Sequence, residues 1–190
     1  KIEILAGQGG SSTGEIYSSA SATIGKADLS AGTVDLEANG AGIGQSGGNT
    51  LEVVSSGQFD ATAGGAIHIT SIAGNALSVG EIDAGANAVT LISDSGVTDT
   101  GTDAATDVTA TTLTINDGSS GSAGTITLDT AVTTLDLKGT GITIQDEDGI
   151  ALAGINATSL DITTGGSIED GGATTVTGLA SFNAGTNQIT

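Results

Sequence analysis

The sequence predicts an all-β fold, and within that class a parallel β-helix, or β-solenoid, of roughly eight coils with about 20–25 residues each. Three observations predict it. Apolar residues alternate with polar ones in many short bursts, glycine-rich breaks separate the bursts, and a few phrases recur along the chain. No stretch carries apolar residues at the spacing of an amphipathic helix over three turns.

The bursts are the expected strands, because alternation with a period of two leaves one face apolar and the other polar. Few of them extend beyond about five residues, which is short for a strand of a sandwich or barrel. In chain order they are "IEIL" (2–5), "VDL" (34–36), "LEVV" (51–54), "IHI" (67–69), "LSV" (77–79), "VTL" (89–91), "LTI" (113–115), "ITL" (126–128), "LDL" (135–137), "ITI" (142–144), "IAL" (150–152) and "LDI" (160–162).

The composition favours a solenoid over a thicker all-β core. With two Phe, one Tyr and no Trp, the chain has few of the large side chains that fill a sandwich. A β-helix has a narrow interior that Ile, Leu, Val and Ala can fill, while Gly, Asn and Asp turn its corners. The alternative is disorder, which low hydrophobicity with a high net charge also indicates. The absence of proline and the regular alternation argue for a folded chain.

Internal repetition supports the coiled architecture. A large apolar residue, then Asp, Asn or Ser, then Ala and Gly or Thr, recurs as "LSAG" (29–32), "FDAT" (59–62), "IDAG" (82–85), "INAT" (155–158) and "FNAG" (182–185). In "IDAGANAVT" (82–90) and "FNAGTNQIT" (182–190), we expect the first residue to face inward and Ala-Gly to turn a corner. The phrases "TTLTI", "TTLDL" and "TSLDI" place leucines at 113, 135 and 160, which we expect to be equivalent positions of successive coils.

The C-terminal stretch "GGSIEDGGATTVTGLASFNAGTNQIT" (165–190) resembles the repeats of filamentous-haemagglutinin-like exoproteins, large bacterial surface adhesins secreted by the two-partner route. Its matching elements are Gly-Gly-x-Ile at 165–168, Thr-x-Val-x-Gly at 174–178, and the Ala-Gly and Ile-Thr pairs that follow. Residues 40–91 fit the same pattern more loosely. The resemblance implies a right-handed β-helical shaft that is exported and held at the cell surface.

The charge balance limits the partners. The chain has 22 acidic residues against three Lys and no Arg, which gives a formal charge of −19. Nucleic acid is therefore not an expected partner, since binding to it depends on Lys and Arg that neutralise phosphates. No apolar run is long enough to cross a bilayer. We expect residues 1–190 to form one β-helical segment that is a fragment of a longer chain.

We expect no catalytic, cofactor-binding or metal-binding residues, and no enzymatic activity. His68, the single histidine, lies between Ile67 and Ile69 and should point into solvent. The densest acidic clusters, "DTGTDAATD" (99–107) and "DEDG" (146–149), could in principle supply a glycosidase pair or oxygen ligands for Ca²⁺. The chain lacks the Arg and Trp that would hold a polysaccharide. Calcium stays open as a weak possibility, because neither cluster matches a known calcium loop.

The expected function is structural: a shaft segment of a large secreted bacterial surface adhesin or extracellular fibre, at the cell surface or in a matrix. Self-association end to end or side by side is expected, because the first and last coils of a solenoid expose strand edges. A cell-surface glycan or receptor and divalent cations are further possible partners. The alternatives are a self-assembling sheath, surface-layer or biofilm-matrix filament protein and, less favoured, a carbohydrate-active β-helix enzyme.

Overall fold

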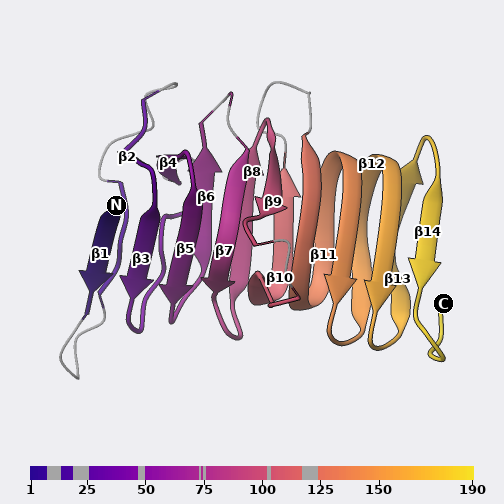
Figure 1. Ribbon diagram of the computed structural model, residues 1–190. Helices are drawn as coiled ribbons and strands as arrows, with labels where there is room; N and C mark the ends of the chain where they lie inside the picture. The colour runs from indigo at the N-terminus through magenta and orange to yellow at the C-terminus, as the bar shows by residue number, and fades with distance from the viewer. Residues whose placement is uncertain are drawn as a thin grey trace.

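The computed structural model describes residues 1–7, 14–18, 26–46, 50–72, 74, 76–101, 104–116 and 124–190. Fourteen strands make up one sheet in which every pairing between named strands is parallel, and no helix occurs among the described residues. Figure 1 shows the chain winding from β1 at one end of the stack to β14 at the other. The all-β class and the parallel β-solenoid predicted from the sequence are confirmed.

All twelve predicted bursts lie in strands. The strands are β1 (Ile2–Ala6), β2 (Leu29–Ala31), β3 (Val34–Ala38), β4 (Leu51–Ser55), β5 (Gln58–Ala63), β6 (Ile67–Ser71), β7 (Leu77–Asp83), β8 (Ala88–Ser93), β9 (Gly96–Asp99), β10 (Val108–Asn116), β11 (Thr125–Asp146), β12 (Ile150–Thr164), β13 (Ile168–Val176) and β14 (Ala180–Asn183). Five of them, β2, β5, β9, β13 and β14, contain none of the predicted bursts. They are rich in Gly, Ala, Ser and Thr, so their extended form depends on the ladders formed with neighbouring coils.

The core consists of columns of aliphatic side chains, one from each coil. The longest ladder joins Ile16, Ile43, Ile67, Val89, Leu113, Leu135 and Leu152 in that order. Each of these residues is at most 7% exposed. Seven positions in one column correspond to about six turns. The prediction of roughly eight coils was therefore too high, because it placed nearly every residue in a coil of 20–25, whereas the first step of this ladder, from Ile16 to Ile43, already takes 27 residues.

One of the predicted repeat families is only partly correct. Leu113 and Leu135 are direct ladder partners, as their common phrase indicates. Leu160 is not the next member of that column, because Leu135 pairs with Leu152 and Leu160 pairs with Ile142. The coil between Leu135 and Leu152 is only 17 residues long, so the leucine of the third phrase falls on another face of the solenoid.

The phrases at 82–90 and 182–190 form the same corner. In the first, the backbone N–H of Gly85 donates to Asp83 Oδ1 at 2.8 Å, and Asn87 Nδ2 donates to the carbonyl of Ala84 at 2.9 Å. In the second, the equivalent bonds run from Gly185 to Asn183 at 3.0 Å and from Asn187 to Ala184 at 3.1 Å. Gly85 and Gly185 have φ of 52° and 57°, a left-handed conformation that glycine adopts without strain.

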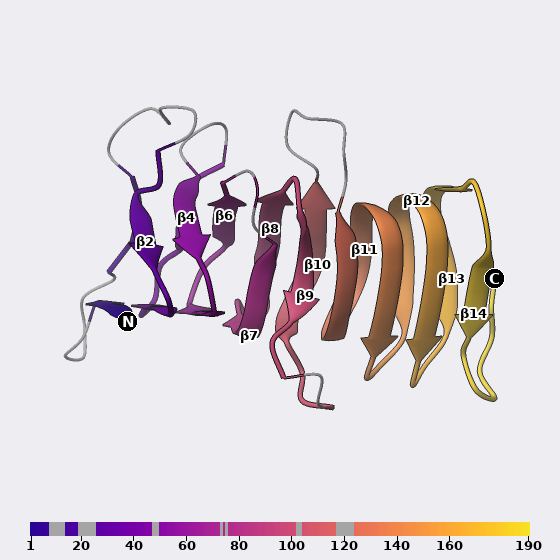
Figure 2. The same cartoon turned by 45° about the horizontal axis from the view of Figure 1, so that its top comes forward.

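Each of the two asparagines also connects its corner to the preceding coil. Asn87 Nδ2 donates to the carbonyl of Gly64 at 3.2 Å, and Asn187 Nδ2 to the carbonyl of Gly165 at 3.0 Å. The two copies are therefore equivalent structural units, and the corner predicted at Ala-Gly is confirmed. Figure 2 shows the end of the stack at which the second copy follows β14.

Some inward positions near the corners carry hydroxyl groups instead of aliphatic side chains. Ser55 Oγ donates to the carbonyl of Gly57 at 3.0 Å, Ser93 Oγ to that of Gly96 at 2.7 Å, and Thr164 Oγ1 to that of Gly166 at 2.7 Å. A buried hydroxyl is tolerated only with a partner, and here each one satisfies a carbonyl that the turn leaves outside the ladder.

The breaks "GQGG" and "NDGSSGSAG" fall largely on residues 8–13 and 117–123, which lie outside the described residues. Residues 47–49 of the break "QSGGN" lie outside them as well.

Candidate functional site

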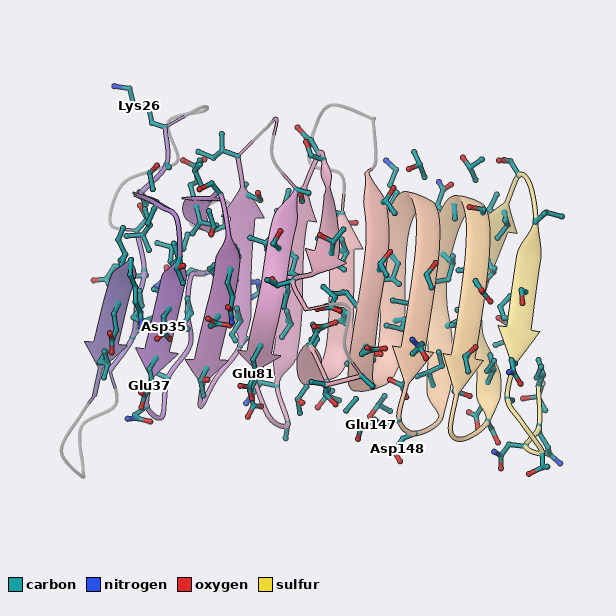
Figure 3. All side chains as sticks on the ribbon, in the orientation of Figure 1. Lys26, Asp35, Glu37, Glu81, Glu147 and Asp148 are labelled. Atoms are coloured by element: carbon teal, nitrogen blue, oxygen red, sulfur yellow. The ribbon has the colours of Figure 1, made fainter. Side chains whose placement is uncertain are left out.

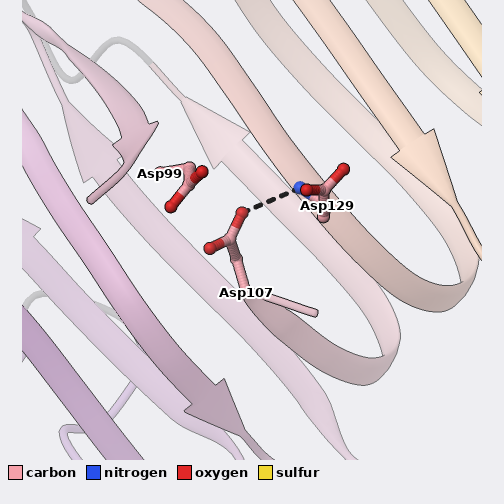
Figure 4. A group of neighbouring side chains, drawn as sticks. All are labelled: Asp99, Asp107 and Asp129. Atoms are coloured by element: carbon pink, nitrogen blue, oxygen red, sulfur yellow. Dashed lines mark hydrogen bonds between the residues drawn. The ribbon is translucent and has the colours of Figure 1, made fainter. Parts of the chain in front are cut away.

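Three carboxylates from three coils meet at one corner of the solenoid. Asp99 ends β9, Asp107 directly precedes β10, and Asp129 lies in β11. One carboxylate oxygen from each lies within 4.8 Å of the others. Figure 4 shows the three side chains side by side on neighbouring coils. This group, the Asp99–Asp107–Asp129 cluster, is the candidate site with the most concentrated charge among the described residues.

The ladder explains why these residues meet. Asp99 pairs with Val79, and Val79 continues a column that contains Phe59 and Val34. Asp99 therefore occupies a position that is apolar in the three preceding coils. Its Oδ1 accepts a hydrogen bond from the backbone N–H of Gly101 at 2.6 Å, which fixes the carboxylate at the end of the strand.

Asp107 and Asp129 are held together by two backbone interactions. The N–H of Asp107 donates to the carbonyl of Asp129 at 2.8 Å, and the N–H of Asp129 donates to Asp107 Oδ2 at 2.8 Å. Asp107 is 2% exposed. Burial raises its pKa to about 7, and the nearby charges of Asp99 and Asp129 add to the shift, against the hydrogen bond from the Asp129 amide.

The cluster has limited chemical capacity. Calcium takes about six to eight oxygen ligands, whereas three converge here, and one oxygen each of Asp99 and Asp107 already accepts a backbone hydrogen bond. An acid with a raised pKa can serve as a proton donor, but a sugar would have to reach it. At 2% exposure, Asp107 offers little surface to any substrate.

The second acidic cluster, at 146–149, separates into an inward and an outward part. Asp146 is 5% exposed. Its Oδ2 accepts hydrogen bonds from Thr130 Oγ1 at 2.8 Å and from the N–H of Val132 at 3.1 Å, and its Oδ1 accepts one from the N–H of Asp148 at 3.0 Å. Glu147 and Asp148 are exposed (Figure 3). Burial raises the pKa of Asp146, and these three hydrogen bonds oppose the rise. Asp146 therefore serves as a structural acceptor at the corner.

Replacing Asp146 with Ala is expected to lower the free energy of unfolding by about 2–3 kcal/mol, because it strands the buried hydroxyl of Thr130 and the amide of Val132 without an acceptor. The matched variant Asp146→Asn keeps a carbonyl oxygen and should cost clearly less. Urea titration followed by circular dichroism measures both. Equal losses for the two variants would contradict a role as acceptor.

His68 lies on the outward side of its strand as predicted, between the fully buried Ile67 and Ile69. It is half-buried rather than fully solvated, and this burial lowers its pKa. No other His exists in the chain, and His68 is not one of the three residues that converge in the Asp99–Asp107–Asp129 cluster. The structure therefore gives it no role in the candidate site.

The sequence indicated part of this site. Both Asp99 and Asp107 belong to the cluster predicted at 99–107. Asp129 was missed, although a signal was present: Asp107 and Asp129 are 22 residues apart, the same separation as the ladder partners Leu113 and Leu135. The coil period, extended to polar residues, would have placed Asp129 beside Asp107.

The comparisons with known proteins identify a repeat. Residues 139–190 match the model of a family described as "Repeats of unknown function (DUF5649)". This match covers the end of β11 and strands β12, β13 and β14, together with the second copy of the corner unit. The chain is thus a repetitive β-solenoid protein over this part. No curated protein and no solved structure matches the chain significantly. No helical segment of the described chain has the length and apolar character of a membrane crossing.

Proposed function

We propose that this chain is a shaft segment of a large secreted bacterial surface adhesin or extracellular fibre, similar to the filamentous-haemagglutinin-like proteins, and that it contributes to attachment at a cell surface or matrix. The observation that carries the proposal is the continuous parallel ladder from β1 to β14. Each coil adds backbone hydrogen bonds and one layer of aliphatic core, so the fold can extend to any length by adding coils.

The surface supports the same role. Most outward positions carry small polar or acidic side chains, and in the view of Figure 3 Glu37, Glu81, Glu147 and Asp148 lie along the lower edge of the stack, with Lys26 at the upper edge. A strongly acidic surface keeps an extended repeat protein soluble through mutual repulsion. Both acidic clusters place a buried Asp where it accepts backbone hydrogen bonds, which suits a structural element better than a catalyst.

An antibody raised against residues 1–190 tests the proposal on intact cells of the source. Immunogold labelling should mark thin fibres that project from the cell surface, and detachment of those fibres should reduce adhesion. Label on a regular lattice around the cell would favour a sheath or surface layer instead. Label confined to lysed cells would overturn the proposal, and so would hydrolysis of a polysaccharide by the purified chain.

A further inference from the structure

The coil that follows β13 exposes two large apolar residues that face the core. Phe182 is 36% exposed and Ile189 is 55% exposed. Together with Leu152 and Ile168 they line a cavity of about 340 Å³, whose rim carries Glu169 and Asp170. Ile82 and Val89, their equivalents in the first copy of the corner unit, are both 0% exposed. The exposed face therefore has the composition of an interface between coils.

The first copy of the corner unit shows what covers such a face. Val108 pairs with Ile82, and Leu113 pairs with Val89, both in parallel. The covering coil thus supplies one inward aliphatic residue for each of the two columns. An occupant of the face at Phe182 and Ile189 needs the same two residues on parallel strands.

The opposite end of this chain carries these residues in the matching columns. The column of Ile82 runs back through Ala61 and Leu36 to Ile4 in β1. The column of Val89 runs back through Ile67 and Ile43 to Ile16. Ile4 is only partly buried against the core, so it has surface left to contribute. Strands β1 and β14 lie at opposite ends of the stack (Figure 1).

We propose that a second copy of this chain docks head to tail on this face, with its Ile4 over Phe182 and its Ile16 over Ile189. The contact continues the established interface between coils and keeps all strands parallel. A tail-to-tail contact would bring Glu169 and Asp170 of both copies together, and repulsion opposes that arrangement. Because the two contacting surfaces differ, the association is open and adds copies along one axis.

This inference concerns assembly and is separable from the proposed shaft function, since a stiff monomer could still be a shaft segment. Sedimentation velocity of the purified chain across a range of concentrations is expected to show species larger than the monomer. Their fraction should rise with ionic strength, because salt screens the repulsion between chains of charge −19.

Two variants each block one end: Phe182→Asp at the tail and Ile4→Asp at the head. Each alone should sediment as a monomer, and an equimolar mixture should form a one-to-one dimer, because one live tail then meets one live head. The control is Leu179→Lys, which changes a side chain that is 86% exposed and not part of the cavity lining. It should assemble like the unaltered chain.

Circular dichroism of each variant separates lost assembly from lost folding, and should give unchanged spectra. If Phe182→Asp fails to fold, Ile189→Lys blocks the same face at a more exposed position. Monomeric behaviour of the unaltered chain at all concentrations and salt levels overturns the proposal. So does loss of association in Leu179→Lys alone, or self-association of either blocked variant.

Discussion

Replacing Leu113 with Ala is expected to lower the free energy of unfolding by about 3–5 kcal/mol. Leu113 is 0% exposed and stands in the longest column, between Val89 of the preceding coil and Leu135 of the next. The substitution removes the contacts to both coils and leaves a cavity that the rigid ladders on either side cannot close. A solenoid is sensitive to such a change, because each coil is supported mainly by its two neighbours.

The matched control is Thr114→Ala on the same strand. Thr114 points outward and is only partly buried, so its loss should cost less than about 1 kcal/mol. Urea titration followed by far-ultraviolet circular dichroism measures both variants under identical conditions. A loss for Thr114→Ala as large as that for Leu113→Ala would contradict the assignment of the inward face.

The second large effect is a pH dependence that arises at Asp107. Its pKa is about 7 in the folded chain against an ordinary value of 3.8. Between these values the unfolded chain releases the proton while the folded chain keeps it, so rising pH favours unfolding across this window. Above about pH 7 both states are ionised and the contribution becomes constant. The fold therefore loses stability from about pH 4 to 7 through this residue.

The variant Asp107→Asn removes this titration while retaining an oxygen that can accept the Asp129 amide. Its gain in unfolding free energy over the unaltered chain should be near zero at pH 4 and about 2–4 kcal/mol at pH 8. Thermal and urea unfolding in EDTA at several pH values measure the difference. Asp161→Asn, at an exposed position of β12, is the control and should show no such trend. A gain that does not vary with pH would show that Asp107 does not titrate in this window.

Much of the fold could be predicted from the sequence because the alternation of side chains is a local property. Ile67, His68 and Ile69 illustrate this: the order apolar–polar–apolar sets which side chains enter the core, whatever their partners are. The corner at 82–90 is equally local, since Asp83 and Asn87 bond to backbone groups within three residues. Its repetition at 182–190 needed only a comparison of the two phrases.

The partners across coils could not be predicted in the same way. Leu160 shares its phrase with Leu113 and Leu135, yet it stands in another column because one coil is shorter than the others. Coil length depends on where the chain turns, and β5, β9 and β13 show that glycine-rich stretches become strands when neighbouring coils offer hydrogen bonds. The coil count was therefore overestimated, although the architecture was predicted correctly.

The sequence by itself determined the parallel β-solenoid class, the inward face of the predicted bursts and the corner unit, because each follows from residues close together in the chain. Only the tertiary structure decided which carboxylates meet. Asp99, Asp107 and Asp129 come from three coils, and their closeness and the raised pKa of Asp107 depend on ladder register and burial. The same is true of the match between Ile4 and Phe182, residues at opposite ends of the stack, because a column is a relation between coils and has no local signal.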